Sequence, residues 1–344
     1  MAKVVPAPRI AKLVTEFVCE YSISDMTMTP DNHLCVAEEE SCVSKYTLAG
    51  LCVGRLKLPD CYLGGVCCLQ SAYGRQLSCL GKQWNDEAYI PGRLAVPTFF
   101  GKSAGRVLIL DGSSGDEFGQ IKAEVDTGDY TYWSVCDLGV DRGLVLARQG
   151  HVATTKQDSC VEVMFRNYRM GDIEKPIGFV WYISSISPDV IIVSDEDIRG
   201  LVMCTLQGEV ITQYSDYGFN PSGLCPDPYR GCIYASNGEG NCVIRLTPDL
   251  EYDGEIVGAA QGLRNPFVVS LSYDGRFLVV AEDTWDIGED LPTPIKVFSL
   301  PDKMMPLLYI CRRNIRKLLG RTLLSAVPFL GLPKCLQNYL LYAV

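Results

Sequence analysis

The sequence has few of the features on which metal enzymes, secreted proteins and membrane proteins depend. Only two histidines occur in 344 residues, and none of the 16 cysteines forms a Cys-x-x-Cys pair, so no zinc site is expected. No apolar run is long enough to span a bilayer, and the first residues lack the apolar core of a secretion signal. The one Asn-x-Ser triplet, Asn220-Pro221-Ser222, is blocked by proline. We therefore expect a cytoplasmic or nuclear protein with free cysteines and no membrane partner.

Positive charge is scarce everywhere except near the end of the chain. Residues 302–344 carry seven Lys or Arg and one Asp, a net charge of +6. The whole chain has a net charge of −10, so the remaining residues carry −16. An acidic body disfavours nucleic acid as a partner, because binding to phosphates needs a basic surface. The same body suits a basic segment of another protein.

A short pattern recurs along most of the chain. It consists of an apolar strand, a turn with Pro, Asp or Gly, a second apolar strand and then a polar residue, as in 26–38, 186–195, 224–237 and 270–282, with weaker copies at 66–80 and 134–148. A third strand usually follows, and a Gly-marked turn leads into a fourth, as in 208–211 and 254–257. Four strands that recur six times predict an all-β fold, a six-bladed β-propeller.

The last repeat ends after its third strand, at Leu300. Residues 9–18 precede the first hairpin and have the composition of a strand. We expect them to supply the missing outer strand of the last blade, which removes an exposed sheet edge. The predicted domains are thus a propeller over residues 1–300 and a small α-helical segment over 304–344.

The C-terminal segment has a regular apolar pattern. Leu307, Cys311, Ile315 and Leu319 recur every fourth residue and form one stripe on a helix, with mostly basic residues on the other side. The small Cys311 leaves a shallow notch between larger side chains, which a partner could fill. A second amphipathic helix is predicted around Leu336, Tyr339 and Leu340, and Pro328 and Pro333 break the chain between the two.

Together these elements resemble a SOCS box, most closely that of the SPRY-domain SOCS-box proteins. The resemblance is carried by the run Pro306-Leu307-Leu308-Tyr309-Ile310-Cys311-Arg312-Arg313-Asn314-Ile315, followed by Leu330-Gly331-Leu332-Pro333. It implies an adaptor that binds Elongin B/C and a cullin. Pro306, Leu307, Leu308, Cys311 and Ile315 would then contact Elongin C, and Leu330, Leu332 and Pro333 would contact cullin-5. In the family the cullin element usually reads Leu-Pro-x-Pro, whereas this chain has Gly331 at the second position.

The repeats resemble the NHL family of propellers, most clearly in residues 233–244. Long insertions fall in loops of one propeller face and carry aromatic residues among acidic ones. The predicted substrate-binding residues there are Trp84, Tyr130, Tyr132 and Trp285. The alternative interpretation is that these aromatic side chains fill the rims of the blades.

The sequence predicts a non-catalytic substrate receptor of a ubiquitin ligase, without cofactor or metal. Neither histidine has a nearby nucleophile motif, and the acidic loop 283–290 does not match a helical calcium loop. One alternative is a calcium-dependent lactonase, since six-bladed propellers include such hydrolases with carboxylates in the central tunnel. Another is an interaction scaffold that never meets Elongin.

Overall fold

The computed structural model describes residues 10–38, 41–58, 61–69, 93–100, 103–113, 117–128, 131–138, 144–149, 160–165, 168–173, 178–187, 189–283, 292–301, 327–333 and 336–337. The chain divides into two compact units. One comprises residues 1–227 with 232–301, and the other residues 228–231 with 302–344.

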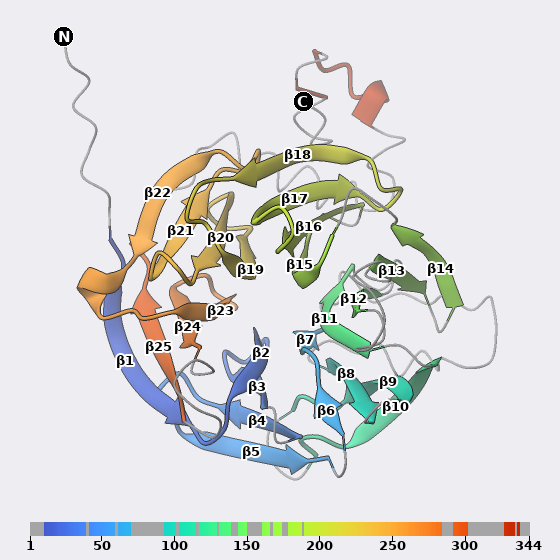
Figure 1. Cartoon of the computed structure of the whole chain (residues 1–344), viewed down its shortest axis with the longest axis vertical. Helices are drawn as coiled ribbons and strands as arrows, with labels where there is room; N and C mark the ends of the chain where they lie inside the picture. The colour runs from blue at the N-terminus through green and yellow to red at the C-terminus, as the bar shows by residue number, and fades with distance from the viewer. Residues whose placement is uncertain are drawn as a thin grey trace. The chain divides into compact units, whose positions relative to one another are not determined.

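The first unit is a six-bladed β-propeller, with its six sheets around a common axis (Figure 1). Blade one has β2 (Ile23–Met28), β3 (Leu34–Glu38), β4 (Cys42–Tyr46) and β5 (Cys52–Lys57); blade two has β6 (Tyr62–Leu63), β7 (Cys67–Cys68), β8 (Leu94–Phe100), β9 (Ser103–Leu110) and β10 (Ile121–Gly128); blade three has β11 (Thr131–Asp137), β12 (Leu144–Gln149), β13 (Cys160–Phe165) and β14 (Tyr168–Ile173). Blade four has β15 (Val180–Ser187), β16 (Val190–Asp195), β17 (Gly200–Thr205) and β18 (Val210–Ser215); blade five has β19 (Pro221–Asp227), β20 (Cys232–Asn237), β21 (Cys242–Leu246) and β22 (Tyr252–Val257); blade six has β23 (Pro266–Leu271), β24 (Phe277–Glu282), β25 (Thr293–Ser299) and β1 (Lys12–Cys19). Short 3-10 turns lie at η2 (Ala259–Gln261) and η5 (Val327–Phe329).

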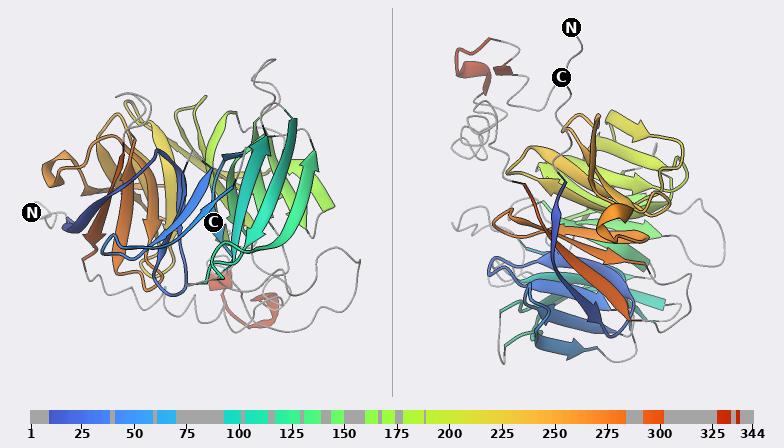
Figure 2. Two further views of the ribbon diagram at one scale, coloured as in Figure 1. Left: turned by 90° about the horizontal axis from the view of Figure 1, so that it is seen from below. Right: turned by 90° about the vertical axis from the view of Figure 1, so that its left-hand side faces the viewer.

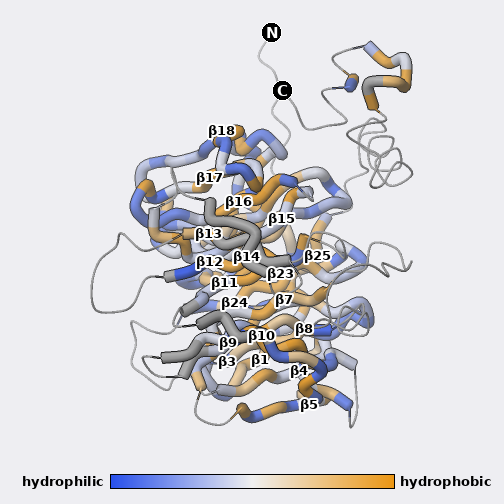
Figure 3. The backbone as a smooth tube through the Cα atoms, turned by 90° about the vertical axis from the view of Figure 1, so that its right-hand side faces the viewer, coloured by the Kyte–Doolittle hydropathy of each residue, from blue (hydrophilic) through white to orange (hydrophobic). Residues whose placement is uncertain are grey.

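Burial along the strands explains their sequences. The second strand of a blade is covered on both faces by neighbouring blades, so β3 and β16 are buried at every residue and read as continuous apolar runs. The fourth strands β5 and β18 lie at the outside, and their residues are exposed or only partly buried. Figure 3 shows the same contrast, with a hydrophobic β16 and a more hydrophilic β18.

The ring is closed by the N-terminal strand. β1 pairs antiparallel with β25, from Lys12 opposite Ser299 to Cys19 opposite Thr293. It is the outermost strand of blade six, and Figure 2 shows it (blue) beside β25 (orange). The backbone N–H of Ala11 also donates to the carbonyl oxygen of Ile256 in blade five, 3.0 Å away. One sheet thus joins both ends of the propeller sequence.

The polar residue that ends the second strand of a blade has a structural role. Asp195 accepts a hydrogen bond from the N–H of Gly178 (2.6 Å), and Glu282 accepts one from the N–H of Arg264 (2.7 Å). Asn237 likewise accepts from the N–H of Asn220 (3.1 Å). In each case the donor lies just before the first strand of the same blade, where the backbone has no ladder partner. The repeated polar residue therefore fixes the chain as it enters a blade.

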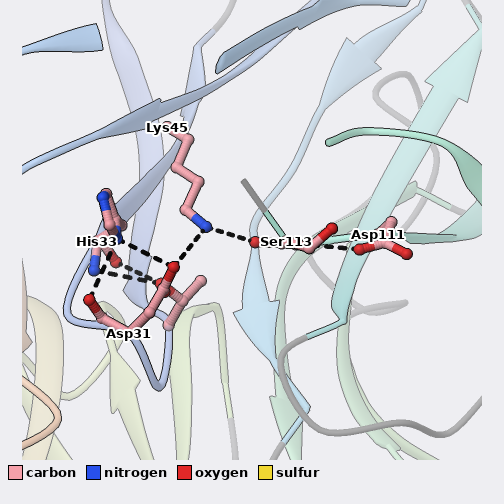
Figure 4. A network of polar contacts seen from close by, with 7 residues as sticks. Asp31, His33, Lys45, Asp111 and Ser113 are labelled. Atoms are coloured by element: carbon pink, nitrogen blue, oxygen red, sulfur yellow. Dashed lines mark hydrogen bonds and ion pairs between the residues drawn. The ribbon is translucent and has the colours of Figure 1, made fainter. Parts of the chain in front are cut away.

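Blades one and two are joined by a buried lysine. Lys45, on β4, is 0% exposed, and its Nζ donates to Asp31 Oδ2 (3.0 Å) and to the carbonyl oxygen of Gly112 (2.6 Å). Figure 4 shows Lys45 between the β2–β3 turn, with Asp31 and His33, and the loop of Asp111 and Ser113. Partial burial acts to raise the pKa of Asp31, but bonds from Thr29 and Lys45 outweigh it and lower that pKa. The Asp31 carboxylate thus stays ionised at neutral pH.

Asp25, on β2, forms a second link between the same blades. Its carboxylate accepts hydrogen bonds from the N–H of Met26 (2.8 Å) and of Val66 (3.1 Å), the latter between β6 and β7. Burial of this carboxyl outweighs both bonds and raises its pKa to about 7.

We expect Asp25 to make the propeller less stable as the pH rises from about 4 to 7. In this window Asp25 holds a proton in the folded state that it has lost in the unfolded state. The stability that Asp25 contributes is therefore complete below pH 4 and is lost as the pH rises through 7. Between these values the free energy of unfolding should fall by about 1.4 kcal/mol per pH unit. Urea unfolding at several pH values should show that Asp25→Asn removes this slope, whereas Asp249→Asn, at an exposed turn, leaves it. Equal slopes in the wild type and Asp25→Asn would contradict the prediction.

Candidate functional site

The innermost strand of five blades begins with a β-bulge. In β2 the pairing moves from Ile23–Glu38 to Asp25–Ala37, which leaves Ser24 as an extra residue. The same irregularity leaves an extra residue in four other first strands, namely Trp133 in β11, one of Trp181 and Tyr182 in β15, one of Ser222 and Gly223 in β19, and Phe267 in β23. We call these bulged residues the bulge collar. Bulges redirect side chains and are common beside functional sites.

Two buried serines stabilise the bulges of blades four and five. The N–H of Tyr182 donates to Ser194 Oγ at 2.9 Å, and the N–H of Gly223 donates to Ser236 Oγ at 2.7 Å. Both serines are 0% exposed and lie on the neighbouring second strand. A bulged residue loses its ladder partner, so a side-chain acceptor is needed to satisfy its N–H. The bulges are therefore defined features of the fold.

In blade two the innermost strand is interrupted rather than bulged. It is divided into β6 and β7, with Gly64 and Gly65 between them. A Cβ on Gly64 would lie 1.8 Å from the carbonyl oxygen of Tyr132, so only glycine allows this approach to β11. The divided strand thus lies directly against the start of blade three.

Tyr182 connects opposite blades across the axis. Its hydroxyl donates to the carbonyl oxygen of Ser24 in blade one at 2.5 Å, and its ring stands edge-on to Phe267 in blade six at 5.6 Å between centroids. Tyr182 itself is on blade four and is 5% exposed. Tyr182 therefore links blades one, four and six at the level of the bulges.

Three further rings form a connected cluster next to Tyr182. The rings of Trp133 and Trp181 meet edge-to-face at 6.1 Å, and those of Phe179 and Trp181 at 5.2 Å. All three side chains keep part of their surface exposed. They come from the start of β11 and β15, so two adjacent blades contribute to one aromatic surface.

Acidic residues surround this aromatic surface. The N–H of Glu196 donates to the carbonyl oxygen of Phe179 at 2.9 Å, which places the β16–β17 turn beside it. A Cβ on Gly178 would lie 2.6 Å from Asp197 Oδ2, so this carboxylate lies next to the residue that precedes Phe179. Glu196 and Asp197 are both exposed. Arg199 lies on the same β16–β17 turn, and its Nη1 pairs with Glu239 Oε1 of the β20–β21 turn at 3.4 Å. The other connections on this face carry the acids Asp216 and Asp283 and the base Arg264.

Of the predicted substrate-binding residues, only Tyr132 is described. It is 2% exposed and packs in the core with Val135 and Leu146, so its ring is not on the surface. The next residue, Trp133, is the one that is bulged and partly exposed. Trp84, Tyr130 and Trp285 lie outside the described residues.

The described surface offers aromatic and acidic contacts but no grouped metal ligands. Within the described ranges no three His, Cys, Asp or Glu side chains come together as a metal site. Burial raises the pKa of the Cys136 thiol above its ordinary range. Such a surface can bind a segment of another protein through ring stacking and ion pairing.

The described part of the C-terminal unit exposes an apolar turn. After η5, Phe329 is 87% exposed and Leu330 is 40% exposed, and Leu336 is 37% exposed. The N–H groups of Leu336 and Gln337 donate to the carbonyl oxygen of Pro333 at 2.9 and 3.0 Å. The predicted Elongin-contacting residues Pro306, Leu307, Leu308, Cys311 and Ile315 lie outside the described residues.

Gly331 gives this turn a backbone that proline cannot adopt. Its φ is +64°, in the left-handed region, whereas the proline ring fixes φ near −65°. The turn Leu330-Gly331-Leu332-Pro333 thus differs in backbone conformation from a Leu-Pro-x-Pro element. Leu330 and Pro333 are exposed and Leu332 is partly exposed, so all three remain available for contact.

Comparison with known families decides the class of the C-terminal segment. Residues 303–341 match the family model of the SOCS box. The chain therefore joins a six-bladed propeller to a SOCS box, a combination that indicates an Elongin B/C and cullin ligase adaptor. SOCS-box proteins are in general non-catalytic substrate receptors. The resemblances to NHL propellers and to the SPRY-domain proteins stay predictions.

No curated protein matches the chain. Among the described residues, none of the helices has the length and apolar character needed to cross a membrane.

Proposed function

We propose that this protein is the substrate receptor of a cullin-5 type ubiquitin ligase. The propeller binds a target protein, and the SOCS box docks on Elongin C. The match of residues 303–341 to the SOCS box is the observation that carries the proposal. The protein needs no reactive group of its own, because the rate gain comes from holding target lysines at high local concentration near a charged ubiquitin carrier.

Elongin C is bound by the apolar stripe of the first predicted helix. Leu307 and Ile315 act as anchors on either side of Cys311, and Pro306 and Leu308 extend the contact at its start. The small Cys311 side chain leaves room for a side chain of Elongin C. The basic residues on the opposite side of this helix stay hydrated.

The cullin is bound by the exposed turn at Leu330, Leu332 and Pro333. The left-handed backbone of Gly331 sets the direction in which Leu330 and Leu332 are presented. Elongin docking and cullin docking are thus assigned to separate parts of the SOCS box, so each can be disrupted without the other.

Replacing Leu307 by Asp and Cys311 by Phe should abolish Elongin B/C binding. The new carboxylate would be desolvated in the contact, and the ring would fill the notch. The loss of two central anchors, each worth about 2 kcal/mol or more, weakens binding at least about 100-fold. Interferometry with full-length protein and purified Elongin B/C gives the affinity.

The control is Arg313→Asp with Lys317→Phe, which introduces the same two residues with the same spacing on the basic side of the predicted helix. It should retain binding to within a few-fold. Leu330→Ala with Leu332→Ala should keep Elongin B/C but lose cullin-5 in the ternary assembly. If the Leu307/Cys311 variant binds Elongin B/C like the wild type, the protein is a scaffold and the adaptor proposal is wrong.

A further inference from the structure

We propose that the aromatic surface at the start of blades three and four and the adjoining β16–β17 turn bind a basic segment of the target protein. The inference deepens the proposed function, because it names the propeller site and the class of substrate. The binding surface consists of Trp133, Phe179 and Trp181, with Glu196 and Asp197 beside them. An Arg or Lys side chain of the target stacks on the indole rings and pairs with the carboxylates.

The aromatic rings of this surface lie where two innermost strands begin. Trp133 is the extra residue of the β11 bulge, between Tyr132 and Ser134, which are 2% and 1% exposed. Its ring meets that of Trp181 in the next blade at 6.1 Å, and both side chains are partly exposed. Exposed indole faces are the strongest cation–π acceptors among side chains. The fold thus positions two such faces together on partly exposed residues.

Charge selects a basic occupant over an apolar or acidic one. Asp197 Oδ2 approaches Gly178, next to Phe179, and Glu196 is hydrogen-bonded through its N–H to Phe179. The turn that carries these two exposed acids is therefore held beside Phe179. The surrounding connections add more acids than bases, so the local potential attracts cationic segments and repels anionic ones.

Peptide pools test this assignment without knowledge of the target. Capped nonapeptides with two fixed central Arg, Glu or Leu residues, and the other positions randomised, are passed over immobilised full-length protein. The Arg pool should be retained at least tenfold more than the Glu and Leu pools, and retention should fall as salt is raised. In a Trp84→Phe, Trp285→Phe background, the Arg pool should also change the remaining tryptophan fluorescence, which comes from Trp133 and Trp181.

Two variants connect retention to the proposed surface. Glu196→Gln with Asp197→Asn should lower retention of the Arg pool at least fivefold. The control Asp249→Asn with Glu251→Gln makes the same charge change at the exposed β21–β22 turn, on the opposite face, and should have no such effect. Trp181→Phe keeps a ring in the core but weakens cation–π stacking, and should lower retention of the Arg pool more than that of the Leu pool.

Equal retention of the three pools would overturn the assignment. An equal loss of Arg-pool retention in the Glu196/Asp197 variant and in the Asp249/Glu251 control would also overturn it. Unchanged tryptophan fluorescence on adding the Arg pool would do the same. Elongin B/C affinity, measured on the same variants, should stay at the wild-type value. The two proposals can therefore fail separately. If the peptide pools are not distinguished but Elongin B/C still binds, only the basic-segment site is wrong. If the Arg pool is selected but Elongin B/C does not bind, only the adaptor proposal is wrong.

Discussion

Removal of residues 2–19 should leave a chain that cannot form the closed propeller. The deletion takes away β1, whose pairing with β25 spans Lys12 to Cys19, and uncovers Ile295 and Phe298, which are both 0% exposed. The opposing ends of the ring then lose their shared sheet. The lost pairing and burial should be comparable with the whole stability of a typical domain, about 5–15 kcal/mol. Circular dichroism, gel filtration and urea unfolding should show an aggregated or non-cooperative protein.

Removal of residues 2–9 is the control for this deletion. It retains β1 and the hydrogen bond from the N–H of Ala11 to the carbonyl oxygen of Ile256. The free energy of unfolding should therefore stay within about 1 kcal/mol of the wild-type value. A synthetic peptide of residues 10–20, added to the longer deletion, should restore cooperative unfolding by adding a strand to the open edge of β25. A soluble, cooperative protein without β1 or the peptide would contradict the role of this strand.

The repeat pattern was sufficient to predict the propeller because its signals are local. The turn Ser272–Arg276 has Asp274 and Gly275 between two apolar runs, and Gly275 has a positive φ of 72°. Continuous apolar runs such as Val190–Val193 mark strands covered on both faces, and the structure buries all four. These features depend on a few neighbouring residues. A single sequence therefore contains them.

The bulge collar could not be predicted in this way. A bulge depends on the pairing of two strands, and one extra residue exchanges the faces of the side chains. Neighbouring residues of a strand face opposite sides, so the register decides that Tyr132, a predicted contact, is buried, whereas Trp133 is partly exposed. A usable signal is the aromatic pair Trp181-Tyr182, which the structure places at the start of β15. Its meaning depended on Ser24 and Phe267, which are distant in sequence.

The replacement Lys296→Met should be among the most destabilising single changes in the propeller. Lys296 Nζ donates to Glu282 Oε1 and to the carbonyl oxygen of Gly262, both at 2.6 Å, and the two charged side chains are each 7% exposed. Methionine fits the space but leaves Glu282 buried without its cation. Breaking one side of a buried ion pair costs about 3–5 kcal/mol. Urea unfolding of the full chain measures this loss.

An exposed pair of equal length gives the comparison that identifies burial as the cause. Arg106 Nη1 lies 2.6 Å from Glu124 Oε1, but the two side chains are 42% and 43% exposed. Arg106→Met should therefore cost about 0–1 kcal/mol of stability.

Adding Glu282→Met to Lys296→Met should cost less stability than the sum of the single changes, because no uncompensated charge remains in the core. The N–H of Arg264, which donates to Glu282 at 2.7 Å, loses its acceptor in this double variant, so its stability should stay below that of the wild type. Additive losses, or equal costs for Lys296→Met and Arg106→Met, would show that the buried pair does not hold β24, β25 and the entry to blade six together.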